Sequence, residues 1–113
     1  DEIRFYLRAR VISDDVKAAL ERLVQMRTEL DGIARQREAL ERDTQEAVNE
    51  QARIRENLKT LQQNTDTYQR QLTKFDALEG QIGDLRTKTA AARQQEESKR
   101  AEIETYLLNL NVE

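Results

Sequence analysis

Residues 16–61 read VKAALERLVQMRTELDGIARQREALERDTQEAVNEQARIRENLKTL, and apolar residues recur along them at alternating intervals of three and four. When heptad position a begins at Val16 and position d at Ala19, eleven of the fourteen a and d residues are apolar. The a residues are Val16, Leu23, Leu30, Arg37, Thr44, Gln51 and Leu58, and the d residues are Ala19, Met26, Ile33, Leu40, Ala47, Ile54 and Leu61. Few other structures need this repeat over seven heptads, so the pattern predicts a long coiled-coil helix.

A second heptad pattern follows a short polar segment. Residues 62–67 are all polar and predict a turn, in which Asn64 suits a left-handed position and Thr65 or Asp66 suits a helix cap. Beyond them, nine of thirteen a and d residues are apolar. The a residues are Tyr68, Phe75, Ile82, Thr89, Glu96, Ile103 and Leu110, and the d residues are Gln71, Leu78, Leu85, Ala92, Lys99 and Tyr106. The sequence therefore predicts helices over 13–63 and 68–110, a turn over 64–67 and a tail over 111–113.

The two heptad patterns are compatible with antiparallel pairing of the helices. In such a pair an a residue faces a d residue, and placing Leu61 opposite Tyr68 extends this pairing as far as Ala19 opposite Leu110. We therefore predict an all-α fold, a long antiparallel two-helix coiled-coil hairpin. The alternative is a long parallel dimer with an interrupted middle.

Three glycines lie inside the predicted helices, outside the a and d positions: Gly32, Gly80 and Gly83. Each costs about 1 kcal/mol relative to alanine, and Gly80 and Gly83 together are the natural place for a break in the second helix. Because the heptad pattern crosses them without a skip, we expect continuous helices.

Residues 1–12 show a different pattern from the rest of the chain. From Ile3 to Val11 the apolar residues fall on odd positions, which predicts a half-buried β-strand. A lone strand is unstable, so this one is expected to belong to a β domain upstream of Asp1 and to pair there. The alternatives are a structureless lead-in and an extra helical turn. Helix formation is then expected to begin at Ser13, followed by Asp14 and Asp15 at the positive end of the helix dipole.

The composition excludes several classes of protein. Charged residues make up 36% of the 113 residues and aromatic residues 4%, and proline is absent, which is typical of long helices. The net charge of −3, with both signs interspersed, argues against a nucleic-acid-binding surface. No stretch reaches the roughly 18 apolar residues that a membrane span needs.

Candidate catalytic and ligand-binding groups are few. The chain contains no histidine and no cysteine, which removes the usual neutral base, the thiolate nucleophile and the common zinc sites. There is no glycine-rich phosphate loop. Carboxylate pairs such as Asp14 with Asp15 and Glu96 with Glu97 are best explained as a helix cap and a solvated face. We therefore predict no enzyme activity, no cofactor and no metal site.

Polar residues inside the heptad core are the first candidates for a specific role. Arg37 occupies an a position, and Glu96 lies about one turn away across the predicted pair. We predict that these two form an ion pair that fixes the register of the hairpin. The alternative is that both side chains extend to water.

The end of the hairpin opposite the turn, here called the open end, carries more apolar residues than two helices can bury. The residues concerned are Leu20, Val24, Tyr106, Leu107, Leu108 and Leu110. We predict that another surface docks there: the strand over residues 1–12, the upstream β domain, or a second copy in a homodimer. The turn end, here called the tip, has a slight excess of basic residues, among them Arg70 and Lys74, which would suit an acidic partner or RNA. A solvated helix surface is the favoured explanation of that excess.

Residues 50–58, EQARIRENL, resemble a stretch near the C-terminus of the mucoidy-inhibitor-like family of bacterial proteins, which carry a C-terminal domain of unknown function. The start at 16–20, the stretch 70–85 and the ending at 107–113 fit the same family more loosely. The resemblance covers about half of the chain. It implies a bacterial protein that combines β domains with coiled-coil segments and is exported. It carries no catalytic motif onto these residues.

Three hypotheses for function follow. The first is a non-catalytic coiled-coil module that serves as spacer, dimerisation arm or docking arm of a larger protein. The second is a helical arm that binds nucleic acid through the basic tip. The third is an accessory segment of an enzyme whose active site lies upstream.

Overall fold

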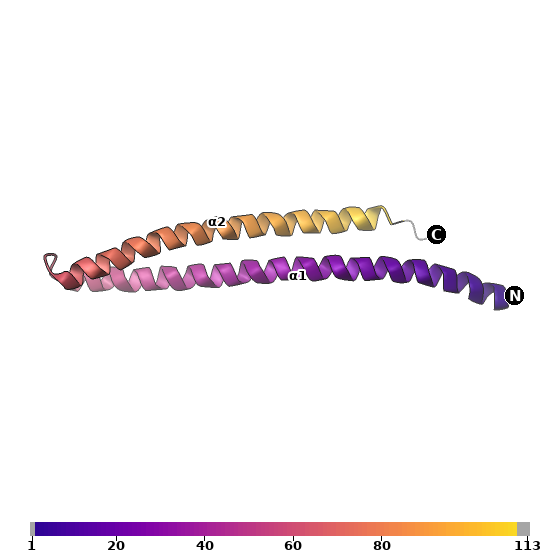
Figure 1. Ribbon diagram of the computed structural model, residues 1–113, viewed down its shortest axis with the longest axis horizontal. Coiled ribbons are helices and arrows are strands. Elements are labelled where there is room, and N and C mark those ends of the chain that lie inside the picture. The colour runs from indigo at the N-terminus through magenta and orange to yellow at the C-terminus, as the bar shows by residue number, and fades with distance from the viewer. Residues whose placement is uncertain (1, 111–113) are drawn as a thin grey trace. The chain divides into compact units, whose positions relative to one another are not determined.

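The computed structural model describes the backbone of residues 2–110 and the side chains of residues 14–110. Two helices make up almost all of it. Helix α1 spans Glu2–Thr60 and helix α2 spans Asp66–Leu108, with residues 61–65 forming the turn between them (Figure 1). The predicted all-α architecture of two long helices is confirmed.

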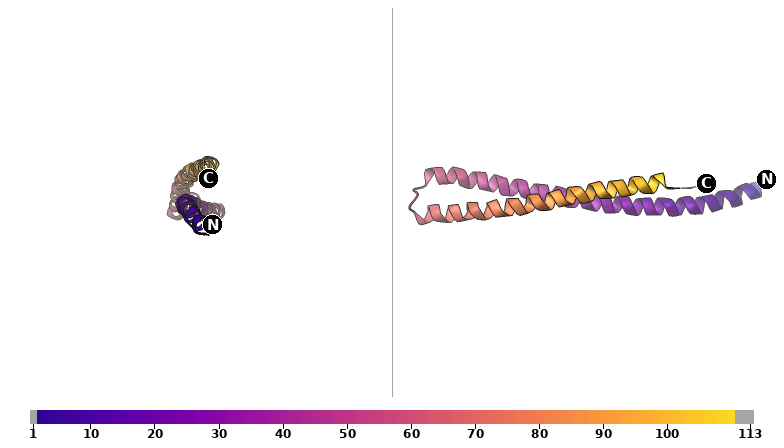
Figure 2. Two further views of the ribbon diagram at one scale, coloured as in Figure 1. Left: turned by 90° about the vertical axis from the view of Figure 1, so that its right-hand side faces the viewer. Right: turned by 90° about the horizontal axis from the view of Figure 1, so that it is seen from above.

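The chain divides into two units that are described separately. Unit 1 comprises Asp1–Ala34 and Gln94–Glu113, and unit 2 comprises Arg35–Arg93. Unit 2 contains the turn and the two helical arms that flank it, which lie side by side and antiparallel (Figures 1 and 2). In unit 1 the early part of α1 and the late part of α2 also run antiparallel (Figure 2). The predicted helical hairpin is therefore present, and each unit shows it locally.

The predicted β-strand over residues 1–12 is wrong for residues 2–12, because these residues belong to α1; Asp1 lies outside the described part. The predicted helix start at Ser13 is wrong for the same reason. A helix satisfies its backbone hydrogen bonds within the segment, whereas a strand needs a neighbouring strand. The sequence is compatible with a helix as well as with a strand. Phe5, Ala9 and Ile12 extend the a and d spacing backwards from Val16.

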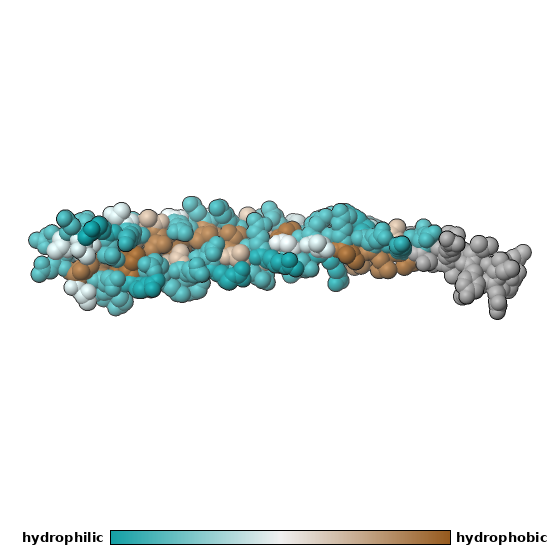
Figure 3. Space-filling view, turned by 60° about the horizontal axis from the view of Figure 1, so that its bottom comes forward, coloured by the Kyte–Doolittle hydropathy of each residue, from teal (hydrophilic) through white to brown (hydrophobic). Residues whose placement is uncertain are grey.

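The heptad positions account for the burial in both units. Every predicted a and d residue is buried or half-buried. The fully buried apolar side chains are Met26, Ala47, Ile54, Ile82, Ala92 and Ile103. In the space-filling view, apolar side chains follow the line where the helices meet, with polar side chains on either side (Figure 3). Burial of this narrow strip is the main apolar stabilisation of the fold.

Thr65 organises the turn. Its hydroxyl donates to the carbonyl oxygen of Gln62 at 2.7 Å and accepts the backbone N–H of Tyr68 at 3.2 Å. The second of these bonds makes Thr65 the N-cap of α2. The predicted left-handed conformation of Asn64 is wrong, because no described non-glycine residue has a positive φ angle. The turn therefore closes through a side-chain hydroxyl.

The glycines do not interrupt the helices. Gly80 and Gly83 both lie inside α2, and Gly32 lies inside α1. A methyl group built at any of the three would meet no atom within 4 Å beyond its own helix. No close approach therefore explains the choice of glycine at these positions.

Candidate interaction surface

The two sides of the helix pair are set by heptad positions e and g. In an antiparallel pair the e residues of the two helices flank one side of the core, and the g residues flank the other. In unit 2, Arg93 and Glu41, both at e, form a 2.8 Å ion pair. In unit 1, Arg22 and Glu102, both at g, approach to 4.0 Å. These pairs define an e flank and a g flank.

The e flank of unit 1 carries exposed apolar side chains. Among the residues whose side chains the structure describes, four large apolar residues are exposed: Leu20 (54%), Val24 (62%), Leu107 (43%) and Leu108 (79%). Leu20 and Leu107 occupy e positions and Val24 occupies a b position beside them, while Leu108 at f faces outward, away from the other helix. We call these four residues the open-end patch.

Two residues of the predicted open-end site contribute to the core instead. Tyr106 and Leu110 are half-buried. The Tyr106 hydroxyl lies 3.5 Å from the carbonyl oxygen of Ala19, at the limit of a hydrogen bond. This contact joins α2 to α1 in unit 1, so Tyr106 is placed to stabilise the helix pair beneath the patch.

The g flank of unit 1 is polar and internally paired. Lys99 donates to Glu29 at 2.7 Å and lies 3.0 Å from Glu102. The hydrogen bond from Lys99 lowers the pKa of Glu29 from its ordinary value of 4.5, and the same bond raises the pKa of Lys99 above 10.5, with Glu102 adding to the rise. The predicted register places Lys99 opposite Leu30. Glu29 is the residue before Leu30, so the ion pair of Lys99 with Glu29 agrees with that register. The g flank of unit 1 therefore has its charges paired, whereas the other side carries the exposed leucines of the open-end patch beside Arg27 and Arg100.

Arg37 and Glu96 fall in different units. In unit 2, Arg37 donates to Glu41 at 3.1 Å. In unit 1, Glu96 is buried to 5% exposure and Arg100 approaches it to 3.5 Å. Both Arg37 and Glu96 make further interactions. The predicted ion pair between Arg37 and Glu96 remains a prediction.

The polar core residues of unit 2 all have hydrogen-bond partners. Gln51 donates to Glu79 across the helix pair at 2.6 Å. The hydroxyls of Thr44 and Thr89 donate to carbonyl oxygens one turn earlier in their own helices, those of Leu40 and Leu85. Glu79 was not among the predicted residues, although it follows directly after Leu78, the predicted opposite of Gln51. These bonds remove the cost of burying polar groups in a narrow core.

The tip offers little free positive charge beyond Arg70 and Lys74, which are exposed. Arg53 pairs with Glu50, and Lys59 with Glu56. Arg55 lies over the ring of Phe75 at 5.5 Å, a cation–π contact. The basic excess at the tip is thus reduced by local partners.

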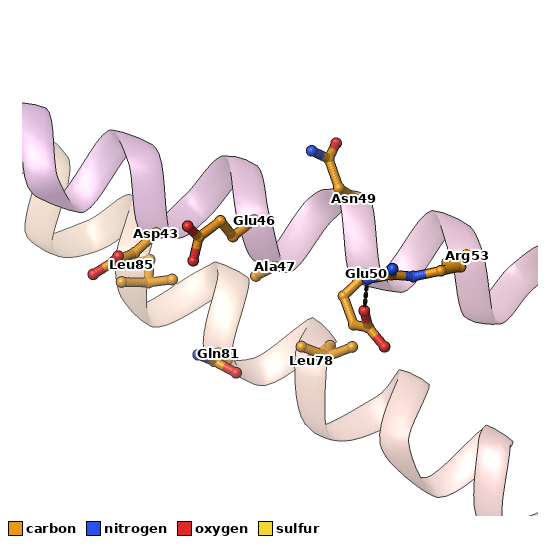
Figure 4. A pocket seen from close by; sticks show the side chains of 9 residues that line it. All are labelled: Asp43, Glu46, Ala47, Asn49, Glu50, Arg53, Leu78, Gln81 and Leu85. Atoms are coloured by element: carbon orange, nitrogen blue, oxygen red, sulfur yellow. Dashed lines mark hydrogen bonds and ion pairs between the residues drawn. The ribbon is translucent and has the colours of Figure 1, made fainter.

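An open groove lies on the g flank of unit 2 (Figure 4). Its α1 side carries Asp43, Glu46, Glu50 and Arg53, and Leu78 and Leu85 contribute from α2 (Figure 4). Among the described residues, no group of three or more acidic side chains is arranged to hold a metal ion. The groove therefore presents an open, largely polar face.

Neither described helix has a stretch long and apolar enough to cross a membrane. Comparisons with protein families, with curated proteins and with solved structures gave no match. The open-end patch is therefore characterised by its own geometry and chemistry.

Proposed function

We propose that this chain is a non-catalytic coiled-coil module that mediates protein–protein contact through the open-end patch. The observation that carries the proposal is that all four exposed large apolar side chains of residues 14–110 lie in unit 1, three of them (Leu20, Val24 and Leu107) on its e side. Exposed apolar area in a cluster is typical of a surface that is covered in the working protein. The module serves as a dimerisation or docking arm of a larger bacterial protein.

The distribution of polar groups supports this assignment. On the g flank of unit 1, Glu29, Lys99 and Glu102 pair with one another, which leaves that side well suited to water. On the e flank, Leu20 and Leu107 take the places that charged residues occupy in unit 2, where Glu41 and Arg93 pair. A helix pair that needed only to act as a spacer would gain solubility from charges on both sides.

Site-specific photo-crosslinking in the cells that make the protein tests the proposal. A photoreactive amino acid replaces, one at a time, Leu20, Val24, Leu107 and Leu108. Matched controls replace Thr73 and Asp76, exposed residues of unit 2. We expect protein adducts from the open-end positions and none from the controls. Equal adduct yields at both ends of the hairpin, or no adduct at any position, would overturn the proposal.

Among residues 14–110, no contact of the tip favours binding of nucleic acid. Two of the basic residues of the tip, Arg53 and Lys59, are in ion pairs with glutamates. Arg70 and Lys74 stay exposed, but two cations supply only a small part of the phosphate contacts that measurable binding needs.

A further inference from the structure

One face of α1 in unit 1 has a self-complementary pattern of residues. It consists of heptad positions b, e and f, which form the outer side of α1 next to the e flank. Its members are Lys17, Leu20, Glu21, Val24, Arg27, Thr28 and Asp31. All seven are exposed. At equal distances on either side of Val24 the charges have opposite signs: Lys17 and Asp31 are each seven residues away, and Glu21 and Arg27 are each three residues away.

We propose that a second copy of this chain covers the open-end patch, with the two α1 helices antiparallel and a two-fold axis passing beside Val24. The inference rests on the proposed function, since it names the partner of that same surface. An interface with two-fold symmetry is self-complementary, so residue i meets residue j and j meets i. The residues around Val24 satisfy this condition.

The charges favour the antiparallel arrangement. An axis at Val24 places Lys17 opposite Asp31 of the second copy and Glu21 opposite Arg27 of the second copy. Each of these opposite-charge pairs occurs twice by symmetry. A parallel arrangement in register would instead place Lys17 against Lys17, and like charges at close range repel.

The apolar residues of both helices lie close to the proposed axis. Val24 meets its own copy, and Leu20 meets Thr28 of the second copy. The Thr28 hydroxyl donates to the carbonyl oxygen of Val24 at 2.9 Å within α1, so packing the threonine methyl group leaves no unpaired donor. In the predicted register Leu107, at an e position of α2, lies level with residue 22 on the same side as Leu20. The second copy therefore covers Leu20, Val24 and Leu107.

The four charged residues are available for such contacts. Lys17, Glu21, Arg27 and Asp31 form no ion pair with any other residue among 14–110. The charges of the neighbouring g flank behave differently, because Glu29 and Glu102 each have a cationic partner in the chain. Charges that border an apolar patch without partners fit the polar rim of an interface.

Charge reversal with rescue tests the arrangement. Sedimentation equilibrium of the purified protein measures the dimer dissociation constant. Lys17→Asp and Asp31→Lys are each expected to weaken dimerisation about tenfold, because each variant turns two attractive pairs into repulsive ones. The combined variant is expected to return to within about threefold of the original constant. Residues 17 and 31 are about 21 Å apart along one helix, so rescue has to come from contact between copies. Weakening without rescue would overturn the antiparallel arrangement.

Cysteine cross-linking tests the position of the axis. The chain has no cysteine, so Val24→Cys introduces the single thiol. A residue beside a two-fold axis can meet its copy within the roughly 4.4–6.8 Å Cα separation of a disulfide, and mild oxidation is expected to give a covalent dimer. Gln25→Cys is the control, because residue 25 follows Val24 in the sequence but points to an adjacent face of α1. We expect it to cross-link at least tenfold more slowly than Val24→Cys. Equal rates for the two variants would overturn the axis at Val24.

The outcomes separate this inference from the proposed function. Photo-adducts from Leu20 or Val24 with twice the mass of the chain, together with recovery of dimerisation in the combined Lys17→Asp and Asp31→Lys variant, support both the proposed function and the second-copy inference. Adducts that contain only a different protein, in a chain that stays monomeric at tens of micromolar, overturn the second-copy inference and leave the docking role standing. An absence of adducts from all four patch positions overturns both.

Discussion

Thr65 shows how much a single side chain contributes to reversing the chain direction. Its hydroxyl bonds to the end of one helical arm, at Gln62, and to the first turn of the next, at Tyr68. The sequence left the choice between Thr65 and Asp66 open, because both residue types are good caps. Only the backbone geometry of the turn distinguishes them, and that geometry depends on where α1 ends.

Removal of the cap is expected to destabilise the hairpin. Thr65→Ala leaves the N–H of Tyr68 without its partner, at a cost of about 1 kcal/mol in the free energy of unfolding. Urea denaturation followed by circular dichroism measures the loss. Thr67→Ala is the control, because Thr67 is exposed and alanine is favoured inside a helix. A cost as large for Thr67 as for Thr65 would contradict the cap assignment.

The glycines of α2 are expected to be sites for stabilisation. Gly80→Ala and Gly83→Ala should each raise the free energy of unfolding by about 1 kcal/mol, because alanine favours helix and the added methyl group meets no neighbouring atom. Thermal unfolding of the single and double variants measures the gain, which should be additive. A loss of stability at either position would show that another surface packs against α2 there.

The carboxylates of the paired helices make stability dependent on acid. Hydrogen bonds from Lys99 and from Arg93 hold the pKa values of Glu29 and Glu41 below 4.5 in the folded chain. As pH falls, the unfolded chain takes up these protons first, so the stabilisation is present above about pH 4.5 and is lost as pH falls through the folded-state pKa values.

Substitution of one of these carboxylates is expected to flatten that dependence. Glu29→Gln should lower stability at neutral pH and reduce the slope of the free energy of unfolding below pH 4.5, measured by urea titration at several pH values. Glu104→Gln is the control, because Glu104 is exposed in the same unit and pairs with no other described residue. An unchanged slope for Glu29→Gln would contradict the role of the Lys99 bond.

At the scale of helices, the sequence was informative wherever the heptad repeat was long. The a and d residues of 16–61 and 68–110 identified the buried positions correctly, because a narrow core between two helices leaves few other places for apolar side chains. The first twelve residues show where this reasoning fails. Within these residues the apolar side chains fit both the two-residue alternation of a strand and the heptad spacing of a helix. The structure decides between the two, because α1 is continuous from Glu2.

The candidate surface could be predicted only in part. The excess of apolar residues near Leu20 and Leu107 is visible in the sequence, but Tyr106 and Leu110 were included with them. Their partial burial depends on how α2 packs against α1, as the contact of Tyr106 with Ala19 shows. The difference between an apolar e flank and a paired g flank was missed as well. The heptad register already indicated a charged g flank, because Glu29 and Glu102 both fall on g positions.

At the scale of the whole molecule, the ion pair of Arg37 with Glu96 is a prediction from the sequence register. A double-mutant cycle with Arg37→Ala and Glu96→Ala measures it through the free energy of unfolding. We expect a coupling energy of about 0.5–1 kcal/mol, because Glu96 is nearly buried. A coupling energy within error of zero would contradict the ion pair and favour side chains that reach water independently.

The antiparallel pairing of a with d residues also constrains how the molecule can change in length. Each residue inserted into one arm would shift every later core residue around its helix by about 100° relative to the other arm. A change of seven residues in α1, matched by seven at the same level of α2, keeps Gln51 beside Glu79 and Lys99 beside Glu29. Gains and losses of sequence during evolution are therefore expected to occur as matched pairs, on opposite sides of Thr65.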